Sequence, residues 1–108
     1  MKHILIIRHA KSSWAEIGQR DFDRPLNERG LRDAPEMARR LMKKKFVINA
    51  FISSPANRAR TTTQLMMQEM KMKDNQLIIV PELYHAPPSV MLDAINNAPN
   101  EYSTIAIV

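Results

Sequence analysis

The stretch Ile4-Leu5-Ile6-Ile7-Arg8-His9 decides the fold of this 108-residue chain. Its four consecutive aliphatic residues predict a β-strand that is buried on both faces, as in a parallel sheet. Arg8 and His9 follow directly, and ligands of open α/β sheets bind just beyond the carboxyl ends of the strands. A guanidinium binds phosphate through two parallel hydrogen bonds, and an imidazole can act as a nucleophile near neutral pH. The pair therefore indicates phosphoryl chemistry on His9.

The rest of the chain alternates strands with helices. Residues 11–25 are polar and lack periodicity, and Asn27 is the expected N-cap of a helix that runs to about Lys45. The other expected elements are a strand at 50–52, a helix capped by Ser54 that starts at Pro55 and ends near Met72, a strand at 77–80, a helix at about 89–96 and a strand at 104–108. This alternation predicts an α/β fold with a parallel sheet.

Composition and charge narrow the class of protein. A hydrophobic content of 44% and a charged content of 25% are ordinary for a soluble globular protein, so we expect a single domain over residues 1–108. The chain has no cysteine, which excludes disulfides and thiolate metal sites. The first residues are too short for a signal-peptide core and no stretch approaches a membrane span, so we expect a cytoplasmic protein without a membrane partner. The net charge of +5 suits an anionic partner, but the few aromatic residues do not interleave with a basic stripe, which disfavours nucleic acid.

Arg58 adds a second cation to the expected site. It lies in the first turn of the helix that follows the second strand, and this turn opens at the carboxyl edge of the sheet. Unpaired amides attract anions to a helix N-terminus, whereas an arginine there opposes the helix dipole. A bound anion explains that placement. We therefore predict that Arg8, His9 and Arg58 converge on one phosphate-sized anion.

The other two histidines fit this site less well. His3 lies at the opposite end of the first strand, roughly 20 Å from His9 along an extended chain. His85 follows the third strand at the same sheet edge as His9, where a solvated or capping histidine is the expected role. Taken alone, His9 is compatible with a structural role as well as a catalytic one. The placement of Arg58 at the same sheet edge favours the catalytic role.

Three segments of the chain resemble motifs of the histidine phosphatase superfamily, which has the phosphoglycerate-mutase-like fold. Arg8-His9-Ala10 is similar to the family's Arg-His-Gly signature, residues 24–30 to its Leu-Thr-x-x-Gly helix start, and residues 53–61 to its Ser-Ser-Pro-x-x-Arg-x-x-x-Thr segment. Lys-Ser-Ser-Trp at 11–14 and Pro-Glu-Leu-Tyr at 81–84 resemble the SixA-type phosphohistidine phosphatase branch. The resemblance implies a three-layer α/β/α fold with a mainly parallel sheet.

The resemblance also implies a role for each matching residue. His9 would be the nucleophile that takes the phosphoryl group, while Arg8 and Arg58 would bind its oxygens and stabilise the transition state. Glu82 lies near the position of the residue that acts as the acid in the mutase branch. A phosphoramidate leaving group needs less help from an acid than an alcohol does, so the alternative is that Glu82 is a solvated glutamate without a catalytic role. Family members use no metal, and the chain offers no acidic cluster or paired histidines for one. The implied partner is a phosphorylated protein or a small phosphorylated substrate, with no cofactor.

The chain departs from the family pattern at its end. The family has a second catalytic histidine directly after the strand that here ends at Val108, and His3 and His85 match no such position. We therefore expect the C-terminal elements of the fold to be missing and Ile105 and Ile107 to lack the elements that pack on them. Phosphatase activity of this chain would then be greatly reduced.

Several functions remain open at this point. The leading interpretation is a phosphohistidine phosphatase, and a phosphatase of small phosphomonoesters belongs to the same class. A non-catalytic phosphate- or phosphoprotein-binding module is an alternative of a different class, which a missing second histidine would fit. Nucleic-acid binding is suggested by the net charge alone.

Overall fold

The computed structural model describes residues 3–8, 20–84, 87–98 and 104–108. Its strands are β1 (His3–Ile6), β2 (Ala50–Ser53), β3 (Leu77–Ile79) and β4 (Thr104–Ile107). Its α-helices are α1 (Glu28–Lys43), α2 (Asn57–Glu69) and α3 (Pro88–Asn96), and its short 3-10 helices are η1 (Asp21–Asp23), η2 (Asp74–Gln76) and η3 (Pro81–Leu83).

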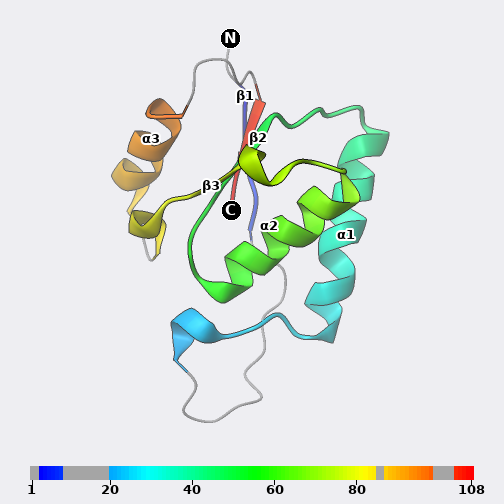
Figure 1. Ribbon diagram of the computed structural model, residues 1–108, viewed down its shortest axis with the longest axis horizontal. Coiled ribbons are helices and arrows are strands. Elements are labelled where there is room, and N and C mark those ends of the chain that lie inside the picture. The colour runs from blue at the N-terminus through cyan, green and yellow to red at the C-terminus, as the bar shows by residue number, and fades with distance from the viewer. Residues whose placement is uncertain (1–2, 9–19, 85–86, 99–103) are drawn as a thin grey trace.

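The four strands form one parallel sheet in the order β1-β4-β2-β3. Helices α1 and α2 lie against one face of this sheet, and α3 lies against the other (Figure 1). The predicted three-layer α/β/α fold is therefore confirmed. Within the described residues, none of the helices combines the length and the apolar character needed to cross a membrane.

The two central strands, β2 and β4, provide the apolar residues for both layers. Side chains alternate between the faces of a strand, so Phe51 and Ala106 pack toward α1 and α2. Ile52, Ile105 and Ile107 pack toward α3 on the opposite face. Burial of apolar surface is the main driving force for folding, and these strands therefore anchor the sheet that positions the candidate site.

The prediction that the first strand is buried on both faces is wrong. β1 is an edge strand: Leu5 and Ile7 pack partly against the α1 and α2 layer and Ile4 against the α3 layer, but Ile6 is 75% exposed. A continuous aliphatic run is therefore compatible with an edge position, and β2 is the strand that is buried at every residue.

The expectation that β4 would lack packing is also wrong. Ile105 is 0% exposed and Ile107 is 2% exposed. β4 pairs with β1 on one side and β2 on the other, and the core cluster facing α3 covers these two side chains. The exposed aliphatic side chain in this part of the sheet is Ile6 of β1.

Helix α1 has the predicted N-cap, and α1 and α2 are both followed by a residue in the left-handed region. Asn27 caps α1 as predicted, because its Oδ1 accepts a hydrogen bond of 2.8 Å from the N–H of Gly30. Lys45 follows α1 with a φ of 63°, and Lys71 follows α2 with a φ of 56°, both in the left-handed region that commonly ends helices. This turn explains why α2 ends at Glu69, earlier than the sequence indicated.

The N-terminus of α2 also differs from the prediction. The helix begins at Asn57 with Ala56 as its N-cap, instead of beginning at Pro55 after a Ser54 cap. The Ser54 hydroxyl still has a local partner, since it accepts a hydrogen bond of 3.2 Å from the N–H of Ala56. This bond forms a tight serine turn between β2 and α2, so Arg58 becomes the second helical residue.

Candidate active site

The parallel sheet places two predicted site residues at the same edge. Because every strand pair is parallel, the carboxyl ends of the strands meet at one edge, here called the carboxyl edge. Arg8 lies shortly beyond β1 with an exposed side chain, and Arg58 lies in the first turn of the helix that follows β2. His9 and His85 fall outside the described residues. His3 begins β1 and therefore lies at the opposite edge, as expected.

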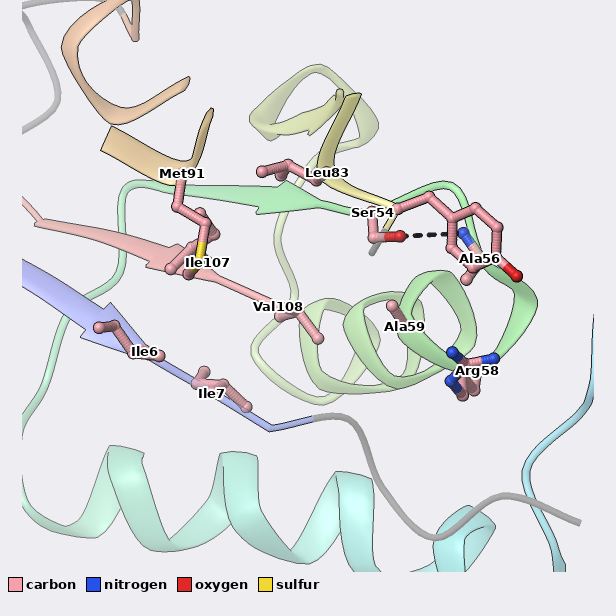
Figure 2. A pocket seen from close by; sticks show the side chains of 11 residues that line it. Ile6, Ile7, Ser54, Ala56, Arg58, Ala59, Leu83, Met91, Ile107 and Val108 are labelled. Carbon is pink, nitrogen blue, oxygen red and sulfur yellow. Dashed lines mark hydrogen bonds between the residues drawn. The ribbon is translucent and has the colours of Figure 1, made fainter. Parts of the chain in front are cut away.

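A pocket of about 200 Å³ opens at the carboxyl edge. Its walls come from the ends of β1 and β4, the junction of β2 with α2, the residues that end η3 and one side of α3 (Figure 2). Ile7 and Val108 line it from the strand ends, and Ala59 and Arg58 line it from the start of α2 (Figure 2). Among the described residues that line this pocket, Arg58 is the one that carries a charge.

The guanidinium of Arg58 is held by a single residue of η1. Its Nη1 donates a hydrogen bond of 2.7 Å to the backbone oxygen of Asp21, and its Nη2 donates one of 3.0 Å to Oδ2 of the same residue. The Arg58 side chain is only 11% exposed. Two hydrogen bonds to one residue fix the plane of the guanidinium as well as its position.

The carboxylate of Asp21 is itself held by donors from three segments. Besides Arg58, the Tyr84 hydroxyl donates to Oδ2 at 2.7 Å and Nη1 of Arg24 donates to Oδ1 at 2.9 Å. The hydrogen bond from Tyr84 is the largest cause that holds the pKa of Asp21 well below its ordinary value, and Arg58 and Arg24 act in the same direction against desolvation. The same hydrogen bond raises the pKa of Tyr84. Asp21 is therefore ionised throughout the physiological pH range.

Two further contacts attach η1 to its neighbours. The side-chain amide of Asn57 donates a hydrogen bond of 3.0 Å to the backbone oxygen of Asp23. The ring of Phe22 meets that of Tyr84 edge to face, with the centroids 5.1 Å apart. The short helix η1 is thus attached to the start of α2 and to the residue that follows η3.

Among the described residues, Glu82 has no part in the hydrogen bonds that hold Asp21 and Arg58. It lies in η3 with an exposed side chain, whereas its neighbours Leu83 and Tyr84 line the pocket. The described residues that line the pocket therefore include those that follow Glu82, and the role of Glu82 as an acid stays a prediction.

Sequence reasoning did not single out Asp21 as a site residue. Asp21 belongs to the non-periodic stretch at 11–25, and its partner Arg58 lies 37 positions further along the chain. One usable signal was an acidic residue close to arginines in a long loop, since loops of that length are often functional. The pairing with Arg58 and Tyr84 depends on tertiary structure and could not be found from local pattern.

Residues 4–84 of the chain match the histidine phosphatase superfamily, branch 1. The chain belongs to this family. The resemblance in its motifs, including the similarity to SixA-type proteins, is confirmed by this match and by the solved structures to which the chain is similar.

Three relatives show how far the similarity extends. A crystal structure of a candidate phosphohistidine phosphatase SixA from Agrobacterium tumefaciens has a TM-score of 0.85 and 32% identity, and the match covers 97% of this chain and 66% of that one. The structure of a protein histidine phosphatase SixA complexed with tungstate has a TM-score of 0.82, with 96% and 66% covered; at 22% identity it shows the fold alone. An uncharacterized chloroplastic protein of Arabidopsis thaliana is 29% identical over 106 residues, which are 95% of this chain and 49% of that protein. The chain thus spans about half to two thirds of the length of these relatives.

Proposed function

We propose that the chain carries the phosphoryl-transfer site of a metal-independent phosphatase that works through a phosphohistidine intermediate at His9. The observation that carries this proposal is Arg58, which lines a pocket at the carboxyl edge and whose guanidinium is fixed by two hydrogen bonds to Asp21. The chain leaves β1 at that same edge and continues into Arg8 and His9. Membership of the histidine phosphatase superfamily supports the assignment of these three residues.

The proposed reaction has two steps. A ring nitrogen of neutral His9 attacks the phosphorus of a phosphohistidine, the phosphorus–nitrogen bond of the substrate breaks, and the leaving imidazole takes up the proton that the His9 ring gives up. Water then attacks the phosphoryl group on His9, which releases inorganic phosphate and returns a proton to the ring. Arg8 and Arg58 bind the phosphoryl oxygens and stabilise the charge that they carry in each transition state.

We propose phosphohistidine on a protein as the substrate. Apart from Arg58 and the polar groups of Ser54 and Tyr84, the described side chains that line the pocket are apolar. Such walls suit a flat imidazole leaving group better than a polyhydroxylated one. The leaving imidazole takes its proton from the His9 ring in this scheme, so Glu82, which is exposed in η3, is dispensable in this proposal.

The test compares phosphate release from a phosphohistidine peptide, a phosphoserine peptide and a small phosphomonoester, using protein produced from its complete coding sequence. We expect the phosphohistidine peptide to be the best substrate. His9→Ala should abolish release, whereas the matched variant His85→Ala should leave it largely intact.

Three outcomes would contradict the proposal. Equal losses from the two histidine variants would mean that the nucleophile is wrongly assigned. Preference for the phosphomonoester would replace the proposed substrate class. Saturable binding of the phosphopeptide without any release would favour a non-catalytic phosphoprotein-binding module.

A further inference from the structure

We infer that Asp21 is a positioning residue, which fixes the guanidinium of Arg58 in the orientation that binds the phosphoryl group in the transition state. This inference rests on the proposed function, because it assigns Arg58 to the phosphoryl oxygens. Asp21 itself would not touch the substrate.

The hydrogen bonds of Arg58 divide its donors into two groups. A guanidinium has five N–H donors in a rigid plane. One N–H of Nη1 and one of Nη2 point to Asp21, at 2.7 Å and 3.0 Å. Within the described part of the chain, the Nε–H and the second hydrogen of each terminal nitrogen remain for a ligand. Arg58 lines the pocket at the carboxyl edge (Figure 2), so an oxyanion bound there can use these remaining donors.

The carboxylate of Asp21 is a firm anchor for Arg58. It receives the Tyr84 hydroxyl and Nη1 of Arg24 in addition to Nη2 of Arg58. The side chain of Arg24 is itself 9% exposed. Arg24 lies directly after η1, whereas Arg58 and Tyr84 are 37 and 63 positions from Asp21 in the sequence. A bound anion therefore cannot pull Arg58 away without breaking its hydrogen bonds to Asp21.

The negative charge of Asp21 makes it possible to distinguish two roles: orienting Arg58 and competing with the anion for Arg58. Asp21 places a negative charge next to Arg58, so it opposes anion binding by Coulomb's law at the same time as it orients the guanidinium. If Asp21 were only a competitor of the anion, its removal would improve both binding and turnover. If it positions Arg58, its removal should lower turnover while ground-state binding is kept, because correct geometry matters most in the transition state.

The experiment compares Asp21→Asn with Asp33→Asn, in which the same substitution breaks an exposed ion pair of α1 with Arg29. Two quantities are measured for each protein: kcat and KM on the phosphohistidine peptide, and the NMR signals of the Arg58 guanidinium, assigned by their loss in Arg58→Lys. We expect Asp21→Asn to lower kcat by about tenfold to a hundredfold with little increase in KM. Its Arg58 N–H signals should average, whereas those of Asp33→Asn should match the wild type.

The outcomes separate this inference from the proposed function. A wild type that releases no phosphate from any substrate contradicts the proposed function, while the NMR signals of Arg58 still decide whether Asp21 fixes it. An unchanged or increased kcat in Asp21→Asn, or Arg58 signals that stay restricted, would overturn the inference. If Asp21→Asn loses its dispersed amide spectrum, Asp21→Glu replaces it, because it moves the carboxylate that accepts from Nη2 of Arg58; unaltered Arg58 signals and unaltered kcat in that variant would also overturn the inference.

Discussion

The centre of the sheet and its carboxyl edge are stabilised by different kinds of interaction. At the centre, Phe51 and Ile105 are completely buried among apolar side chains. At the carboxyl edge, Arg58 and Tyr84 both donate to one carboxylate, that of Asp21. Apolar burial is non-directional and tolerant of small shifts, whereas hydrogen bonds to a carboxylate fix distances and angles. Substitutions at the centre should therefore change stability strongly, and substitutions at the edge should change function more than stability.

Phe51→Ala should have the largest effect, and it tests the centre of the sheet. Phe51 is 0% exposed and belongs to the core cluster under α1 and α2. Removal of a fully buried phenyl ring leaves a cavity and lowers the free energy of unfolding by about 3–5 kcal/mol. Denaturant titration followed by circular dichroism measures this loss. Phe46→Ala is the matched control, because Phe46 is 44% exposed; similar losses in the two variants would contradict the distinction between core and surface.

Arg58→Ala tests the edge and should separate function from stability. We expect kcat on the phosphohistidine peptide to fall by about a hundredfold, which is the usual consequence of removing one donor to a developing oxyanion. Arg60→Ala is the control, because Arg60 is an exposed arginine of the same helix turn. Steady-state kinetics and thermal unfolding of both variants measure the two effects. A similar loss of activity in Arg60→Ala would mean that the net charge of this helix end matters more than the position of Arg58.

Tyr84→Phe should have the smallest effect, which depends on pH. The lowered pKa of Asp21 contributes stability that is fully present above its unfolded value, about 3.9, and is lost as the pH falls toward the folded value. The Tyr84 hydroxyl is the largest cause of that shift, so its removal raises the folded pKa of Asp21. The variant should be slightly less stable than the wild type at pH 7. The unfolded pKa is the same in both proteins, so the two should become more alike only as the pH falls below the folded pKa of Asp21 in the variant. Unfolding curves at pH 7, 4 and 2 measure this, and a difference that grows as the pH falls would contradict it.

The sequence predicted the fold better than it predicted the site. Runs such as 50–52 and 77–80 and the cap at Asn27 are local signals, and each of these elements formed close to its expected position. The exposure of Ile6 was missed because an aliphatic run does not reveal the order of strands in a sheet. Asp21 was missed because its hydrogen bond to Tyr84 joins residues 63 positions apart. The local sequence is enough to identify Arg58 as a candidate, but Asp21, which holds its guanidinium, is identified only from the tertiary structure.

Trapping the intermediate is the sharpest test of the proposal that phosphoryl transfer to His9 takes place at the carboxyl edge. The protein is mixed with a phosphohistidine peptide, quenched in base within the first turnover, digested and examined by mass spectrometry. We expect a phosphoryl group on the peptide that contains His9, which acid removes and which is absent in His9→Ala. Phosphate release with the phosphoryl group on any other residue, or with none on His9 at the earliest times, would contradict it.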